Sequence, residues 1–211
     1  MSATRELDQP PARFRAAVEQ LRAVRLRPEV RLSEVPAPQR IAPFAAALGA
    51  EVGSGDRETG TGRLVLLHDP DGNESWHGTF RCVAFVRADV DPEMVRDPVL
   101  SAVAWSWLTE AWGAHGLDVV APSGTVTVVL SEGFGGIAAD GLTAQVEVRA
   151  SWTPDEEATG PEVPGADVPG ADVPRLAAHV ESWADLLGAA AGLPPLTDGV
   201  VPLSPRRGAR G

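Results

Sequence analysis

The sequence predicts an α+β fold: an antiparallel sheet of four to five strands, arranged as two hairpins, with three main helices packed largely on one face. Three observations lead to this prediction. Residues 64–67 and 80–86 are apolar runs on either side of a polar turn, residues 143–152 alternate strictly between apolar and polar side chains, and three other stretches repeat apolar residues with the helical period. The expected order is helix, short irregular segment, hairpin, helix, hairpin, linker and helix.

The N-terminal part of the chain should contain one helix and little other regular structure. Residues 1–9 are expected to be a flexible end, and Pro10-Pro11 then favours a helix start because proline suits the first helical turn. The apolar stripe of this helix consists of Phe14, Ala17, Val18 and Leu21. Beyond it we expect a short edge strand at Val30–Leu32, a short helical turn at Phe44–Gly49 and a loop without apolar anchors at Gly53–Gly62.

The first hairpin is expected to lie at the centre of the sheet. Its turn is assigned to Asp69–Asn73, where Gly72 tolerates a positive φ and the Asp and Asn side chains bond to nearby backbone groups. Its second strand is apolar on both faces, as is typical of a strand that is covered on both sides. Cys82, the only cysteine, lies in that strand and is interpreted as a buried thiol, so no internal disulfide can form.

The helix expected from Val99 to Ala114 carries more apolar surface than one sheet can cover. Its two apolar stripes together span roughly 200° of the circumference, so a second element must cover Trp105 and Trp112. The favoured cover is another helix of the chain; the alternatives are a dimer or partner surface and a ligand groove. Trp105 and Trp112 are therefore the predicted binding residues. The wider stripe comprises Leu100, Val103, Ala104, Trp107 and Ala111.

The second hairpin is expected to join Thr125–Ser131 to Thr143–Trp152 through a glycine-rich connection. Pro122-Ser123-Gly124 is interpreted as the turn that precedes it. In the second strand, the even-numbered residues from Ala144 to Trp152 are apolar and the odd-numbered ones polar, which predicts one buried and one solvated face.

The C-terminal part is expected to hold a linker, a helix and a tail. Residues 154–174 contain the tandem repeat VPGAD and are interpreted as an acidic Pro/Gly linker within a single domain that spans residues 10–195. A helix from Arg175 to Ala191, with Leu176, Val180, Trp183, Leu187 and Ala190 on its apolar face, is the favoured cover for Trp105 and Trp112. Residues 196–211 are expected to be a disordered tail.

Composition excludes several classes of function. The chain has 211 residues and a net charge of −11, and its first eight residues lack the apolar core of a secretion signal, so we expect a cytoplasmic protein. No apolar run approaches the roughly 18 residues of a membrane span, so no membrane partner is expected. Residues 41–205 contain seven arginines and 24 acidic residues, a balance of −17, which makes nucleic acid an unlikely partner.

One group of residues has the chemistry of a metal site. His68, Asp71 and His77 lie around the first turn, and two imidazoles with a carboxylate can bind zinc or iron. Their spacing matches no standard metal motif, and the simpler interpretation is a polar turn. The sequence also lacks the GxSxG, Walker and Rossmann patterns. We therefore predict no catalytic residue, no cofactor and no metal, and keep His68, Asp71 and His77 as the alternative.

Several segments resemble a known family when they are taken together. They include RPEVRLSEVPAPQRIAPFAAAL, LHDPDGNESWHGTFRCVAFVRADVDPEM, WSWLTEAW and EVRASWTP. The pattern covers most of residues 12–195 and is similar to an actinobacterial domain-of-unknown-function family, number three thousand in its series. The resemblance implies a small cytoplasmic protein without an assigned activity. It also implies an association with RNA processing, because genes of the family lie near one for a ribonuclease-D-like exonuclease.

These observations favour a non-enzymatic binding or adaptor module. The Trp105/Trp112 region would contact an unknown protein partner or a second copy of the chain. Two alternatives stay open: a metal-dependent enzyme or metal-binding protein that uses the His68–His77 turn, and an accessory protein in RNA processing.

Overall fold

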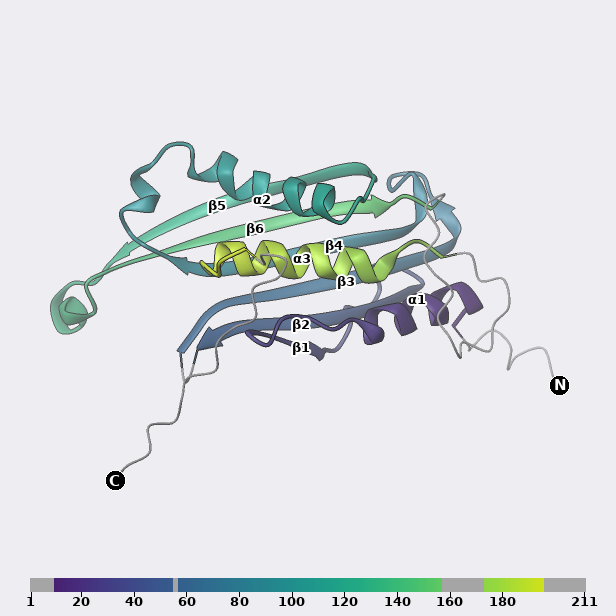
Figure 1. Cartoon of the computed structure of the whole chain (residues 1–211), viewed down its shortest axis with the longest axis horizontal. Coiled ribbons are helices and arrows are strands. Elements are labelled where there is room, and N and C mark those ends of the chain that lie inside the picture. The colour runs from purple at the N-terminus through teal and green to yellow at the C-terminus, as the bar shows by residue number, and fades with distance from the viewer. Residues whose placement is uncertain (1–9, 55–56, 157–172, 196–211) are drawn as a thin grey trace, which may run out of the picture.

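The computed structural model describes residues 10–54, 57–156 and 173–195 of the chain. Six antiparallel strands form one sheet in the order β1-β2-β3-β4-β6-β5, and three α-helices accompany it (Figure 1). The helices are α1 (Ala12–Ala23), α2 (Leu100–Ala114) and α3 (Leu176–Ala190). The strands are β1 (Val30–Glu34), β2 (Phe44–Ser54), β3 (Arg57–Asn73), β4 (Gly78–Val90), β5 (Val119–Glu132) and β6 (Leu142–Pro154); two short 3-10 helices, η1 (Met94–Arg96) and η2 (Gly135–Asp140), lie in the connections.

All three helices lie on the same face of the sheet. Figure 1 shows α2 across β5 and β6, α3 across β4 and β3, and α1 near β2 and β1. The even-numbered residues of β2, β3, β4 and β6 point toward these helices and form the core with them, because side chains alternate along a strand. The predicted alternation in β6 is confirmed, since Ala144, Val146, Val148, Ala150 and Trp152 are all buried.

The fold class and the three helices are confirmed, but the sheet has six strands rather than four or five. The additional strand is β2, so the helical turn predicted at Phe44–Gly49 is wrong. Its alanines favour helix locally, yet pairing with both β1 and β3 overrides that preference. The loop predicted at residues 53–62 is also wrong in its described part, because β2 continues to Ser54 and β3 begins at Arg57.

Two predicted turns lie inside strands. The tight turn of the first hairpin is at residues 74–77, whereas residues 69–72 form an irregular part of β3 that accounts for the register shift between His68 and Asn73. Pro122–Gly124 belongs to β5, which has a register shift between Val120 and Ser123. In both places a bulge accommodates the Pro and Gly residues that suggested a turn. The predicted flexible end, the tail and residues 157–172 of the predicted linker lie outside the described residues.

A polar contact ties the end of β6 to the start of the chain. The Glu156 carboxylate accepts hydrogen bonds from the backbone N–H and hydroxyl of Thr79 in β4, and it pairs with Arg13 of α1 at 3.1 Å. Burial alone would raise the pKa of Glu156, but these hydrogen bonds and the charge of Arg13 hold it below its ordinary value. Residues 154–156 therefore help to position α1. No helix in the described ranges is long and apolar enough to cross a membrane.

Helix α3 approaches the sheet closely where β3 has glycines. A Cβ atom on Gly62 would lie 2.8 Å from Cζ2 of Trp183 and 3.3 Å from Cδ2 of Leu187. Trp183 is fully buried, and its indole N–H donates to the carbonyl oxygen of Phe85 at 3.4 Å. The small residue in β3 thus makes room for the largest side chain of α3.

Replacing Gly62 by alanine should lower the free energy of unfolding by about 1–3 kcal/mol, because a buried indole cannot move aside without disturbing its neighbours. Gly113→Ala is the matched control: nothing lies within 4 Å of the added methyl group, and the position is helical. That variant should gain up to about 1 kcal/mol. Urea denaturation measures the free energy of unfolding of both variants. Equal stability of Gly62→Ala and the wild type would contradict the packing described for α3.

Candidate functional site

The face of the sheet opposite the helices carries the odd-numbered residues of the central strands. The strand register places these residues in rows that run across the sheet. One row contains Arg63, Phe85, Arg149 and Thr125; the next contains Val65, Val83, Ser151 and Ser123. Arginine, aromatic, aliphatic and hydroxyl side chains from four strands therefore meet on one surface, which we call the open face.

A cavity of about 520 Å³ lies over these two rows. Its floor includes Val83, a residue of a central strand that is nevertheless 36% exposed. β4 was predicted to be covered on both sides, but its side opposite the helices is only partly covered. The lining residues are Arg63, Val65, Val83, Ala84, Phe85, Ser123, Gly124, Thr125, Arg149, Ala150 and Ser151.

Two arginine side chains flank Phe85, the aromatic residue of the open face. The Arg149 guanidinium lies over the Phe85 ring, 5.1 Å from its centroid, and also pairs with Glu147 at 2.8 Å. On the other side of Phe85, Arg63 is its cross-strand partner and donates to the backbone carbonyl of Pro36. Both guanidinium groups remain exposed, so an incoming anion can reach them.

A third arginine reinforces the positive charge from behind the cavity wall. Arg81 is only 7% exposed, and its guanidinium donates to the hydroxyls of Ser151 at 2.7 Å and Thr153 at 3.1 Å. No carboxylate pairs with Arg81 among the described residues. Ser151 in turn contacts the Ser123 hydroxyl at 3.2 Å, which extends this polar chain into the cavity. Burial lowers the pKa of Arg81, but an arginine stays charged in proteins.

Other parts of the chain define the borders of the cavity. Val35, Ala37, Ala42 and Trp76 pack on Ala47, Val65 and Leu67 and so cover one end of the open face. From the helix side, Trp105 lies directly beneath Gly124: a Cβ atom there would be 2.6 Å from Cζ3 of Trp105 and 2.3 Å from the carbonyl oxygen of Arg149. Glycine is therefore required at the point where β5, β6 and α2 approach one another.

The two tryptophans predicted to bind a partner differ in their surroundings. Trp112 is 5% exposed and packs edge-on against Trp152, with 5.1 Å between ring centroids. Trp105 is half-buried against the core. A groove of about 560 Å³ does lie between α2 and α3, but its indole is Trp107. The binding role of Trp105 and Trp112 stays a prediction.

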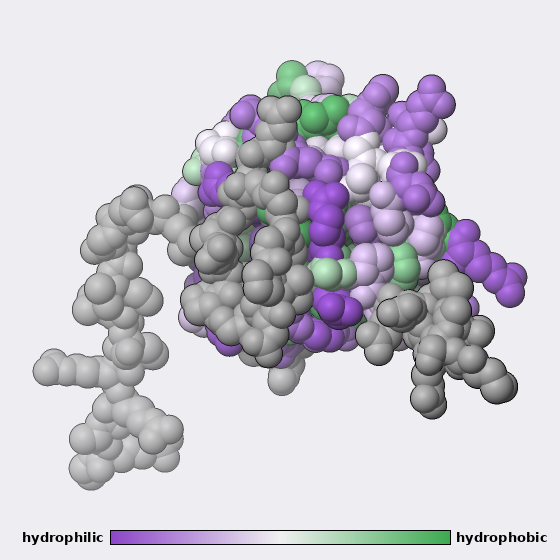
Figure 2. Space-filling view, turned by 90° about the vertical axis from the view of Figure 1, so that its right-hand side faces the viewer, coloured by the Kyte–Doolittle hydropathy of each residue, from purple (hydrophilic) through white to green (hydrophobic). Residues whose placement is uncertain are grey.

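The residues around the first turn do not form a metal site. His68 is 1% exposed, stacks on Phe80 with 4.2 Å between centroids and bonds through Nδ1 to the carbonyl of Thr79 at 3.0 Å. Asp71, in the irregular part of β3, and His77, in the turn, are both exposed. That end of the molecule presents mostly hydrophilic side chains among the residues that Figure 2 colours. Within the described ranges, no group of three His, Cys, Asp or Glu side chains could hold a metal ion.

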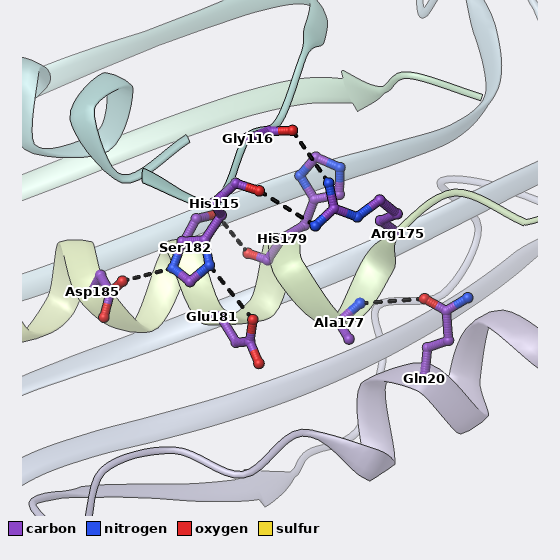
Figure 3. Close-up of polar contacts among 9 residues, drawn as sticks. All are labelled: Gln20, His115, Gly116, Arg175, Ala177, His179, Glu181, Ser182 and Asp185. Atoms are coloured by element: carbon purple, nitrogen blue, oxygen red, sulfur yellow. Dashed lines mark hydrogen bonds and ion pairs between the residues drawn. The ribbon is translucent and has the colours of Figure 1, made fainter. Parts of the chain in front are cut away.

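A second polar cluster joins the end of α2 to α3 and α1 (Figure 3). His115 contacts Asp185 at 2.8 Å and Glu181 at 3.5 Å, and Arg175 donates to the carbonyls of His115 and Gly116. The Gln20 side chain of α1 accepts from the backbone N–H of Ala177 at 3.4 Å. Each contact links two elements of the helical layer, so we interpret this cluster as structural.

His179 lies next to this cluster but inside the core. It is 2% exposed and accepts a hydrogen bond at Nδ1 from the indole N–H of Trp152, at 3.1 Å. Burial lowers the pKa of His179 to about 3, with smaller contributions from the charges of Arg175 and His115. The imidazole is therefore neutral at pH 7 and serves as an acceptor for Trp152.

The open face was not predicted from the sequence, because its residues come from four strands that are far apart in the chain. One signal was present. The predicted wet face of Thr143–Trp152 already contained Glu147, Arg149 and Ser151, and five of the seven arginines in residues 41–205 (Arg57, Arg63, Arg81, Arg87 and Arg149) occupy odd positions in observed strands.

Comparison with known proteins identifies a family but no function. The model of the family described as "Protein of unknown function (DUF3000)" matches residues 10–201. This match confirms the family resemblance drawn from the sequence. No curated protein and no solved structure matches the chain.

The buried imidazole makes stability depend on pH. The fold disfavours the protonated form of His179. The contribution of the neutral imidazole to the free energy of unfolding is therefore fully present above the ordinary histidine pKa of 6.5, and it is lost as the pH falls from there toward about 3. As the pH falls through this range, the free energy of unfolding of the wild type should decrease relative to that of His179→Gln, which keeps a hydrogen-bond acceptor, by up to ~1.4 kcal/mol per pH unit. Chemical denaturation at a series of pH values measures this difference, and parallel curves for the two proteins would contradict a neutral buried His179.

Proposed function

The chain belongs to the DUF3000 family of proteins of unknown function, and we propose that it is a binding module whose open face holds a partner segment with apolar and acidic side chains. The observation that carries this proposal is the cavity in which half-buried Phe85 lies between Arg63 and Arg149, with exposed Val83 in the next row. Apolar surface on a central strand costs free energy in water and is typical of an interaction site when charged residues flank it.

The charge of the surface specifies the partner. The residues that line the cavity include Arg63 and Arg149 and no acidic residue, whereas the chain as a whole has a net charge of −11. A guanidinium can bind a carboxylate through two parallel hydrogen bonds, and its planar group also packs on aromatic rings. An acidic segment of a protein, with apolar side chains to cover Val83 and Phe85, fits these features. Nucleic acid fits less well, because the acidic surroundings repel a phosphate backbone beyond this patch.

The remaining candidates have supporting or weaker roles in this proposal. Trp105 supports the cavity from beneath Gly124, and Trp112 anchors α2 on Trp152, so both would affect binding indirectly. The metal-dependent alternative has no set of ligands around His68 and His77 in the described part of the chain. A cytoplasmic location, as expected from the sequence, agrees with a reduced, buried Cys82.

An anionic aromatic probe should bind at the open face. Anilinonaphthalene sulfonate combines an apolar ring system with one negative charge, and its fluorescence rises when it leaves water. We expect Val83→Glu to weaken its binding at least ~10-fold, because the new carboxylate repels the sulfonate and makes the floor polar. Raising the salt concentration should also weaken binding.

Val103→Glu is the matched control, because Val103 of α2 is 38% exposed, close to the 36% of Val83, but lies on the helical layer. This variant should bind the probe as the wild type does. An equal loss of probe binding in both variants, or no loss in Val83→Glu, would refute the proposed binding surface. Binding of a single-stranded RNA oligonucleotide that Val83→Glu abolishes would instead favour the accessory role in RNA processing.

A further inference from the structure

The two edge strands of the sheet are protected to very different degrees. β1 is five residues long and has two ion pairs, Arg31 with Glu51 and Arg22 with Glu34. β5, at the other edge, is 14 residues long. Natural sheets protect their edges with short strands, charged side chains, proline or bulges, because an unpaired edge can pair with another strand. β1 is protected by its short length and by these charged side chains.

Within its own sequence, β5 has protective features only in its first residues, and η1 is a further element that approaches the strand. Pro122, the register shift between Val120 and Ser123, and a left-handed Ala121 (φ 46°) all lie before Ser123. From Ser123 to Glu132 the strand pairs with β6 without a break. This run contains no proline, and its only charged residue is the last one, Glu132. Its β-branched residues strongly favour an extended strand.

The same end of the sheet exposes large apolar side chains. β5 and β6 continue beyond the other strands as an arm with η2 at its tip (Figure 1). Leu130 is 45% exposed on β5, and Phe134 and Ile137 are 73% and 62% exposed at the tip. Val129 and Leu142 are also exposed. Scattered apolar residues are ordinary, but a group at one end of the sheet, with Val129 and Leu130 on the edge strand itself, is typical of an interface.

We propose that β5 pairs antiparallel with β5 of a second copy of this chain. A two-fold axis perpendicular to the sheet near Thr127 makes the strand its own partner, and side chains opposite one another then point to the same face. The neutral run from Ser123 to Ser131 allows two chains of net charge −11 to approach without placing acidic side chains opposite one another. The two six-stranded sheets become one continuous sheet with both helical layers on the same side.

The pairing also places the two cavities next to each other. Ser123 and Thr125 of β5 form one side of the cavity, and beyond them the open face ends at the unpaired edge. In the dimer, β5 of the second copy continues that face. The dimer does not depend on the binding of any partner, so it can be tested separately from the proposed function.

Sedimentation equilibrium of the full chain tests the proposal. The wild type should change from 22.1 kDa toward twice that mass as its concentration rises. Higher salt should tighten the dimer, because it screens the repulsion between two acidic chains, whereas it weakens anion binding at the cavity. Val129→Lys, which puts a desolvated charge in the seam, should raise the dissociation constant at least ~10-fold.

Ser33→Lys is the matched control, since it places the same side chain at an exposed position of the other edge strand. This variant should dimerise like the wild type, and circular dichroism should show the native fold in both variants. The proposal fails if the wild type stays at 22.1 kDa at every concentration, if Val129→Lys dimerises unchanged, or if Ser33→Lys weakens the dimer equally.

Discussion

The structure depends on the one-sided burial of a six-stranded sheet. Three helices cover the even-numbered side chains of the central strands, and their close approach requires glycine at positions such as Gly62. The odd-numbered side chains then receive only the partial cover of residues 35–42 and Trp76. A sheet covered in this way must make its second face compatible with water. Here arginines contribute to this: the Arg149 guanidinium lies over the Phe85 ring, and Arg63, the cross-strand partner of Phe85, is exposed to solvent.

This arrangement separates structural polar contacts from those available to a partner. On the helical side, His179, Gln20 and the Glu156–Arg13–Thr79 contact are satisfied within the chain and join its elements. On the open face, Arg63 and Arg149 use only part of their hydrogen-bonding capacity, and Arg81 has hydroxyl partners but no carboxylate among the described residues. Unused donors beside exposed apolar surface are what an acidic, apolar segment would satisfy.

Local pattern was a good guide to some elements and a poor one to others. The alternation in β6 and the apolar stripes of α1 and α3 predicted those elements, because each pattern depends on neighbours within the same element. β2 was missed because alanine and glycine carry little strand preference, and pairing with β1 and β3 decides its conformation. Val103 was assigned to the buried face of α2 but is exposed, because the buried face of that helix is centred on Ala104, Leu108 and Trp112.

The candidate site required information that no single segment holds. Arg63, Phe85 and Arg149 share a row only because of the register between β3, β4 and β6. The strictly alternating strand showed which side chains would be wet, but not that the wet faces of three other strands would join it. The fold class could thus be predicted from periodicity, whereas the surface could be recognised only once the strands were ordered.

The exposure of the open face can be measured directly at two adjacent residues of β4. Cys82 points into the core, is 2% exposed, and burial raises the pKa of its thiol to about 12, so it should not react with a thiol reagent in the native protein. Val83 points the other way, and a Val83→Cys variant should react at the rate of an accessible thiol. One fast-reacting thiol in the variant and none in the wild type would support a solvent-accessible binding surface. A variant as unreactive as the wild type would show that the face is covered, and would contradict the account.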